Sequence, residues 1–150
     1  MKNHTPKNIF VNGPLTPSFI GEKIQAHQSK TGIGAHSIFL GQIRADEKNG
    51  HIVEAIEYEA YTDMALMRMY EIREALFQKY SLTCLHVYHS LGRVAASEIS
   101  LFVFVSSVHR AEAIQACAEL VEFIKKDLPV WGRECWKEGH TWKQPFSPGL

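Results

Sequence analysis

Cysteine is scarce in this sequence, and its three copies form no pattern. Cys84, Cys117 and Cys135 are odd in number and widely spaced, and no C-x-x-C motif occurs. A disulfide framework needs paired cysteines and common structural zinc sites use closely spaced ones, so neither is expected. The eight histidines include no H-x-x-x-H or H-E-x-x-H pattern. We therefore predict no metal site and no cofactor.

Long apolar runs and an excess of charge of either sign are also missing. The N-terminal stretch MKNHTPKNIF lacks the apolar core of a signal peptide, and no run approaches a membrane span of about 18 apolar residues. Lys plus Arg and Asp plus Glu number 16 each, so no overall field attracts nucleic acid or an anionic membrane. Together with the unpaired cysteines, these absences predict a cytoplasmic protein. Any anion site must be local.

What is present is the composition of a globular domain. The 150 residues are 45% hydrophobic and 21% charged. A chain of this length buries roughly 68–70% of its unfolded surface without disulfides or metals. We therefore expect a single soluble domain over residues 1–150.

The hydrophobic pattern predicts several strands. Alternation in IEYEA indicates a half-buried strand, whereas ISLFVFV is typical of a strand buried on both faces. The pair Asn49-Gly50 predicts a turn, and a small aromatic hairpin should turn near Glu138-Gly139 before a loose tail. Strands are expected over 8–13, 34–45, 52–61, 82–90 and 99–107, with a loop over 91–98.

Capping residues and apolar spacing predict the helices. Thr16 and Pro17 open a first helix that should end at Gly32, and Asp63 is the expected N-cap of a second. A third should run from about 109 to 127. The expected inner positions of the second and third helices are Ala65, Met69, Ile72, Leu76, Tyr80, Ala113, Cys117, Leu120 and Ile124. The class is α+β, with two long helices against a mostly antiparallel sheet.

His109 and Arg110 follow the buried strand at the start of the third predicted helix. The partial positive charge of a helix N-terminus disfavours a cation there by about 0.3–1 kcal/mol. The same backbone N–H groups and a forked guanidinium would bind a phosphate or carboxylate. The pair therefore predicts an anion site, unless Arg110 is solvated and Glu112 offsets its charge.

Lys125 lies in the last turn of that helix, beside the inner residue Ile124. Partial burial turns a lysine into an acid–base group, although a lysine also suits a helix C-terminus without any further role. Fifteen residues separate Lys125 from Arg110, which is about 22 Å along a straight helix. If both serve one small-molecule site, two chains must each donate one helix end. The spacing therefore predicts a dimer.

Three further charged or nucleophilic positions are candidates. Arg44 ends a predicted strand just before a glycine-containing loop, a common place for a binding residue. Arg133 and Glu134 are either site residues or a surface ion pair, which would contribute little. Cys135 and His140 suggest a Cys–His nucleophile, but no third orienting group accompanies them.

Several separated motifs resemble one family. GQIR ends a predicted strand, IEYEAYTDMA leads into a helix, HSLGRV and SSVHRAEA flank a buried strand, and FIKKDLPVWGRE precedes HTWK. In this order, from about Gly34 to Lys143, they resemble the large, catalytic subunit family of molybdopterin synthase. The resemblance implies an α/β hammerhead fold and a homodimer. It also implies that each copy binds one ubiquitin-like small subunit, so that the assembly is a heterotetramer.

The resemblance also implies an activity. The C-terminal Gly-Gly tail of the small subunit enters the large subunit's pocket as a thiocarboxylate. Its sulfur passes, in two rounds, to a cyclic pyranopterin monophosphate, whose cyclic phosphate opens to give molybdopterin. The expected enzyme is therefore a sulfurtransferase of molybdenum cofactor biosynthesis, with no nucleic-acid or membrane partner.

The family's functional residues carry over by position. The segment GQIR matches a substrate-contact stretch that usually reads G-K-V-R, with Gln42 in place of the lysine. His109 and Arg110 match a pair that implies binding of the substrate's phosphate, and Lys125 matches a lysine that stabilises or protonates developing charge. The implied substrate-binding positions are Gln42, Ile43, Arg44, His109, Arg110, Lys125, Gly132, Arg133 and Glu134, and the implied catalytic positions are Lys125 and Arg133.

One departure from the family leaves alternatives open. Gly132 stands where many members have a second lysine. Arg133 supplies a neighbouring positive charge, but an arginine is no general acid near neutrality, and successive strand residues point to opposite faces. The second hypothesis is therefore a non-catalytic relative that binds the pterin or the tail. A phosphate-binding module without a partner and a hydrolase using Cys135 rank below it.

Overall fold

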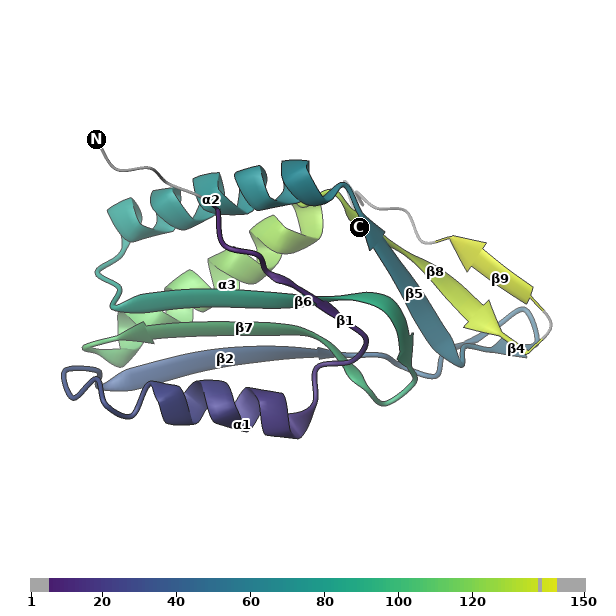
Figure 1. The fold of residues 1–150 in the computed structure, drawn as a ribbon, viewed down its shortest axis with the longest axis horizontal. Helices are drawn as coiled ribbons and strands as arrows, with labels where there is room; N and C mark the ends of the chain where they lie inside the picture. The colour runs from purple at the N-terminus through teal and green to yellow at the C-terminus, as the bar shows by residue number, and fades with distance from the viewer. Residues whose placement is uncertain (1–5, 138, 143–150) are drawn as a thin grey trace.

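A seven-stranded, mostly antiparallel sheet organises the chain (Figure 1). The structure is a computed structural model that describes residues 6–137 and 139–142. The strands along the sheet are, in order, β2 (Ala35–Gln42), β7 (Ile99–Ser107), β6 (Cys84–Ala95), β5 (Ala55–Ala60), β8 (Val130–Trp136) and β9 (Gly139–Trp142). A short β1 (Phe10–Asn12) runs parallel to β6. This arrangement confirms the α+β prediction.

Strand β7 is the centre of the core, as the pattern ISLFVFV predicts. Its residues from 100 to 107 are all buried. Because side chains alternate along a strand, Leu101, Val103 and Val105 enter one hydrophobic cluster, whereas Phe102 and Phe104 enter a second on the other face. A strand without a polar face needs cover on both sides, and the helices supply it.

The helices form two layers around this sheet (Figure 1). The long helices α2 (Thr62–Lys79) and α3 (Arg110–Asp127) pack on the face of Leu101, Val103 and Val105, and α1 (Pro17–Ala26) covers the opposite face. The predicted inner positions are confirmed from Ala65 to Leu76 in α2 and from Ala113 to Ile124 in α3, which are all buried. Tyr80 differs, because it is the half-buried C-cap residue that follows α2. None of the described helices is both long and apolar enough to cross a bilayer.

Strand β6 is longer than predicted. The expected loop over 91–98 was wrong for residues 91–95, because β6 continues to Ala95. The segment lacks a strong local strand signal, but β5 pairs with it from Tyr58 opposite Gly92 to Ala55 opposite Ala95. Tertiary pairing therefore outweighs local composition here.

The helix boundaries also differ from the predicted ones. Helix α1 ends at Ala26 rather than Gly32, because residues 27–33 form tight turns with bonds such as Lys30 N–H to the His27 carbonyl (3.1 Å). Helix α2 begins at Thr62 and its N-cap is Tyr61, so Asp63 lies in the first turn, where its charge still suits the helix dipole.

The predicted turn and the predicted C-terminal hairpin are both confirmed, and the turn joins two unexpected strands. The Asn49-Gly50 turn joins β3 (Glu47–Lys48) and β4 (His51–Ile52), two short strands that the pattern did not predict. The C-terminal hairpin exists as the β8–β9 pair, with Trp136 opposite Gly139. Glu138, expected in its turn, and the expected tail over 143–150 lie outside the described residues.

Candidate active site

The predicted site residues fall at opposite ends of α3. Helix α3 is unbroken from Arg110 to Asp127, so Arg110 and Lys125 are about 22 Å apart at 1.5 Å per residue. Strand β2 runs between the same two ends, because its start pairs with the end of β7 and its end pairs with the start of β7. The predicted site residues of one chain therefore fall into two candidate partial sites, a first with Lys125 and the Arg44 end of β2, and a second with His109 and Arg110.

The Arg44 end of β2 is anchored by the residue before it. Ile43 is only 3% exposed and packs in a small cluster with Ile56 and Val94. Its N–H donates to the Glu98 carbonyl at 2.9 Å, and its own carbonyl accepts from the Ser97 N–H at 2.8 Å. These bonds hold the strand end in place.

Arg44 and Gln42 point away from that anchor. Both residues are exposed. The Arg44 side chain is 82% exposed and meets Asp46 at 3.3 Å. A fixed backbone with a solvated guanidinium is suited to capture an anion that arrives from solution.

Lys125 lies in the last turn of α3, close to a fully buried histidine. Burial, with a smaller contribution from the nearby Lys125 ammonium, lowers the pKa of His89 to about 4. The His89 Nδ1–H donates to the Ser90 carbonyl at 2.8 Å, so the neutral ring keeps its Nε2 lone pair. Lys125 itself is exposed and has a partner in the structure. The lysine is thus accessible from solvent and backed by a neutral imidazole.

Tyr58 joins this region from the adjacent strand. Its ring packs edge-on against His89 with centroids 5.0 Å apart, and its hydroxyl lies 3.3 Å from Ser100 Oγ. Burial raises the pKa of Tyr58, so it stays a neutral hydroxyl. Analysis of single residues did not identify Tyr58 or His89. Both lie within motifs that carried the family resemblance, IEYEAYTDMA and HSLGRV, and that membership was the available signal.

Gly132 offers no room for a side chain. It is buried on β8, directly opposite Tyr58. A Cβ at this position would sit 2.6 Å from Ile56 Cγ2 and 3.3 Å from Tyr58 Cε1. A lysine here, as the family pattern has it, would require Ile56 to move. In this chain, position 132 therefore contributes backbone alone.

The next two residues of β8 have different partners. Arg133 binds Glu57, which lies opposite it on β5, and this bond raises the pKa of the guanidinium further. Glu134 is 7% exposed and accepts from Lys48 Nζ at 3.1 Å through both oxygens. Each of these two residues thus has a partner on another strand, where the sequence suggested an ion pair between the two. Since neighbouring strand residues alternate, Arg133 faces away from the Gly132 side of the sheet.

The second partial site lies where β7 leads into α3. His109 is the N-cap residue in extended conformation, and its carbonyl accepts a hydrogen bond from Ser107 Oγ. The preceding residue, Val108, packs so closely on Gly34 that a Cβ on this glycine would lie 2.1 Å from the Val108 carbonyl oxygen. This contact fixes the loop beside the start of β2.

The two basic side chains of this second site are open to solvent. His109 and Arg110 are both exposed. Of the ion pairs within the described part of the chain, none includes Arg110, so Glu112 makes no direct ion pair with it. An exposed guanidinium at a helix N-terminus is suited to bind an anion.

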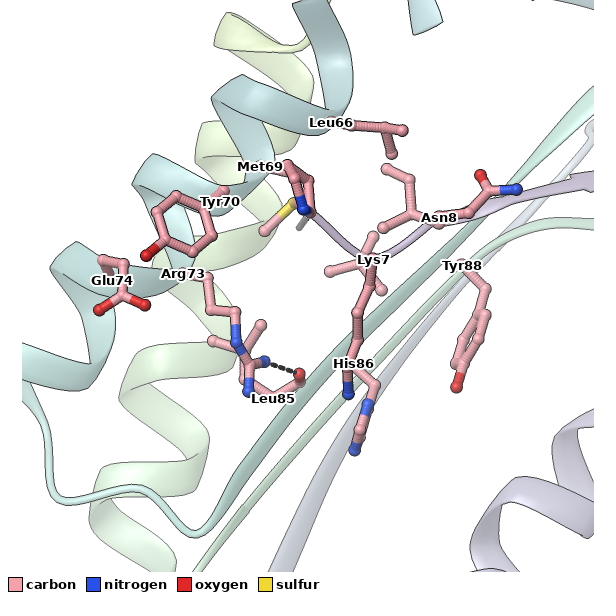
Figure 2. A pocket seen from close by; sticks show the side chains of 13 residues that line it. Lys7, Asn8, Leu66, Met69, Tyr70, Arg73, Glu74, Leu85, His86 and Tyr88 are labelled. Carbon is pink, nitrogen blue, oxygen red and sulfur yellow. Dashed lines mark hydrogen bonds between the residues drawn. The ribbon is translucent and has the colours of Figure 1, made fainter. Parts of the chain in front are cut away.

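A cavity elsewhere contains none of these residues. It measures about 420 Å³ and lies between α2, the segment over 6–9 and β6 (Figure 2). Arg73 crosses it to donate to the Leu85 carbonyl on the unpaired part of the β6 edge. Its lining comes from three separate stretches without a shared motif, so the sequence carried no signal for it. The nucleophile suggested for Cys135 also stays untested, since the side chain of His140 lies outside the described residues.

Comparisons with known proteins relate the whole arrangement to one group. A family model described as "MoaE protein" matches residues 16–127. The molybdopterin synthase catalytic subunit of Pyrococcus abyssi is 39% identical over 121 residues, which cover 81% of this chain and 81% of that protein. The human catalytic subunit is 37% identical over 110 residues, 73% of this chain, and the match spans 58% of the human protein.

Solved structures agree with the sequence comparisons. The crystal structure of molybdopterin synthase from Staphylococcus aureus superimposes with a TM-score of 0.81 and 30% identity, covering 94% of this chain and 99% of that chain. A complex of subunits 1 and 2 of the molybdopterin-converting factor from Helicobacter pylori gives a TM-score of 0.77 at 18% identity, covering 90% of this chain and 88% of that chain. The second likeness concerns the fold alone.

Proposed function

Because this chain belongs to the MoaE protein family, we propose that it is the catalytic subunit of a molybdopterin synthase and acts as a sulfurtransferase. Its substrate is a cyclic pyranopterin monophosphate, and its sulfur donor is the thiocarboxylate at the C-terminal Gly-Gly tail of a ubiquitin-like small subunit. The observation that carries this proposal is the family match, supported by the presence of Arg44 and Lys125 at the positions that the family resemblance implies.

Lys125 is the central residue of the proposed mechanism. As the thiocarboxylate sulfur attacks and the cyclic phosphate opens, negative charge develops on oxygen, and a nearby ammonium stabilises or protonates it. The exposed position of Lys125 supports access to a bound substrate, and the neutral His89 behind it adds no competing charge. Gln42, Ile43 and Arg44 form the adjoining wall for the substrate.

The complete site is proposed to need two copies of the chain. Strand β2 is at the edge of the sheet, with Ile38 and Leu40 exposed by 39% and 42%. Antiparallel pairing of two β2 strands about a two-fold axis would bring the Arg44 end of one copy beside the Arg110 end of the other. The eight residues of β2 span about 26 Å at 3.3 Å each, close to the length of α3 between Arg110 and Lys125.

In this assembly His109 and Arg110 of the second copy bind the phosphate of the substrate. The helix N-terminus and the guanidinium then both face an anion, which accounts for a cation at the positive end of a helix dipole. The homodimer with one small subunit on each copy gives the heterotetramer. We place the enzyme in the cytoplasm, because its three free thiols and its thiocarboxylate partner suit a reducing compartment.

Arg133 and Glu134 have supporting parts in the proposal. Arg133 adds positive charge near the tail-binding side while Glu57 holds its guanidinium. Glu134 fixes Lys48 of the β3–β4 hairpin beside β8. The closed position of Gly132 favours a second candidate function, a relative that binds pterin or tail without turnover, because the family's second lysine has no counterpart here.

A single-turnover assay decides between the two. Purified chain and thiocarboxylated small subunit are mixed with the cyclic precursor, and product is followed for wild type, Lys125→Ala and Lys126→Ala. Lys126 is the matched control, since it lies in the same turn and forms an exposed ion pair with Glu122 at 3.9 Å. We expect product from wild type and Lys126→Ala, with a loss of at least about 100-fold in Lys125→Ala. No product from wild type, with the small subunit bound, would favour the non-catalytic relative. Equal product in all three would refute the role of Lys125.

A further inference from the structure

Two imidazoles and a thiol meet on the sheet face beneath α1, on the opposite side of the sheet from α3. They belong to His27 at the end of α1 and to Cys84 and His86 near the start of β6. One ligand atom of each residue lies within 4.8 Å of the other two. His27 and Cys84 are buried and His86 is half-buried, so the group is largely shielded from water. Its members are 59 positions apart at the extremes, which hides the group from any motif search.

The backbone fixes the direction of these side chains. Cys84 and His86 are two residues apart on one strand and so share a face. His27 is the C-cap of α1, where its N–H bonds the Ile24 carbonyl at 3.0 Å. The end of α1 therefore places the His27 imidazole over β6.

Hydrogen bonds define which nitrogen of each ring is free. His27 Nδ1 lies 2.8 Å from the Lys23 carbonyl, which only accepts, so this nitrogen carries the proton and Nε2 presents a lone pair. His86 Nε2 lies 3.0 Å from that lone pair and must donate to it. An N–H to carbonyl bond on the remote nitrogen is the arrangement that orients metal-bound histidines.

The spacing is close to that of a tetrahedral metal site. Two nitrogens bound to zinc at 2.0–2.1 Å lie about 3.3 Å apart, against 3.0 Å between the two Nε2 atoms here. The Cys84 Sγ lies within 4.8 Å of one ring nitrogen of each histidine. The cations Lys7, Arg73 and Lys30 lie near the ring of His86.

Positive charge around the cluster opposes a divalent ion, and the thiolate offsets part of it. Lys30 Nζ donates to Cys84 Sγ at 2.9 Å, and Figure 2 shows Lys7 extending towards His86. A thiolate can accept from Lys30 and bind a metal at once, because it has more than one lone pair. Lys30 is exposed, so its ammonium also has the freedom to turn towards water.

We propose that His27, Cys84 and His86 bind one zinc ion, with water as the fourth ligand. The donor set of two imidazoles and one thiolate suits zinc among the common divalent metals. On binding, the Cys84 S–H bond breaks, a Zn–S bond forms, and the proton leaves to solvent. The Nε2 proton of His86 moves to its Nδ1, which frees Nε2 for the metal. One proton is therefore released for each ion bound, and the metal ties the end of α1 to β6.

Cobalt is the probe, because a thiolate bound to Co²⁺ gives a charge-transfer band in the near ultraviolet. The full chain, without a histidine tag, is titrated with Co²⁺ and then with Zn²⁺, which should displace it. We expect saturation at one ion per chain. Cys84→Ser should remove the band and weaken zinc binding at least about 100-fold. Cys117→Ser is the matched control, since Cys117 is also buried but lies on α3, and it should keep the band.

Wild-type protein alone can overturn the proposal. Absence of the band at millimolar cobalt, or a band of equal strength in Cys84→Ser, would contradict it. If Cys84→Ser does not fold, alkylation of the wild-type protein tests the zinc site instead. Zinc should protect Cys84 from a thiol reagent and leave the modification of Cys135 unchanged, and equal labelling of Cys84 with and without zinc would contradict the site. None of these readouts depends on sulfur transfer.

Discussion

Tyr58 lies directly opposite Gly132 in the β5–β8 pair, and its ring borders the space that a side chain at position 132 would need. The tighter limit is Ile56, which a Cβ at position 132 would approach to 2.6 Å. The glycine is thus matched to its two neighbours on β5. Glycine in place of the family's lysine at position 132 therefore removes a positive charge and also fits the close packing of this site.

Gly132→Lys should destabilise the fold. Overpacking a well-filled site costs about 1–3 kcal/mol, and Ile56 must shift to admit the new side chain. Urea unfolding would measure the loss. Gly32→Lys is the control, because nothing lies within 4 Å of a Cβ there and the residue is exposed. Adding Ile56→Ala to Gly132→Lys should recover part of the loss from crowding, and unchanged stability in Gly132→Lys would show that the site is less filled than described.

Mixing two inactive variants should restore activity. If each site combines Lys125 of one copy with Arg110 of the other, a dimer of Lys125→Ala with Arg110→Ala has one intact site and one doubly altered site. Random exchange makes half the dimers mixed, so we expect about a quarter of wild-type turnover. A mixture no more active than its separate components, after exchange has been verified, would mean that the two residues do not act across chains.

Arg133→Gln should lower turnover far less than Lys125→Ala. Arg133 is held by Glu57 and lies on the face opposite to Gly132, so its charge acts at longer range than that of Lys125. We expect a loss of less than about tenfold, below the 10²–10⁴-fold typical of an acid–base group. Single-turnover rates would measure it. A loss in Arg133→Gln equal to that in Lys125→Ala would give Arg133 a direct part in the reaction.

Stability should fall as the pH drops from 6.5 towards 4. Burial holds the pKa of His89 at about 4, below its ordinary 6.5, so in this window the unfolded chain binds a proton that the folded chain refuses. One such group contributes a slope of about 1.4 kcal/mol per pH unit. Urea unfolding across this range, with a chelator present, should show a shallower slope in His89→Gln. His51→Gln, whose ring stacks on Trp136, should keep the wild-type slope. If wild type and both variants show the same dependence of stability on pH, His89 does not cause the loss of stability.

The local hydrophobic pattern predicted correctly those elements whose structure depends on residues close in the sequence. Helix α3 runs over 110–127 as its apolar spacing predicts, and β7 is buried on both faces as ISLFVFV predicts. The distance between Arg110 and Lys125 could also be predicted from the sequence, because the rise per residue of an α-helix is constant.

The same pattern did not predict features that depend on contacts between residues far apart in the sequence. Residues 92–95 are strand because β5 lies beside them, and Leu91 pairs with β1. His27 and His86 meet only because α1 ends above β6, so scattered histidines gave no indication of a cluster. Gly132 was identified as a departure from the family, but its cause, the fit of Ile56 and Tyr58, needed the β5–β8 register.

The unbroken α3 also limits how this protein can change over generations. Inserting or deleting one residue within it would rotate one end by about 100° relative to the other and shift it by about 1.5 Å. Lys125 would then leave its place beside His89 while Arg110 kept its own, and in the proposed dimer both composite sites would be lost together. If the proposal holds, the solvent-facing positions of α3 can accept many substitutions, whereas its length cannot change.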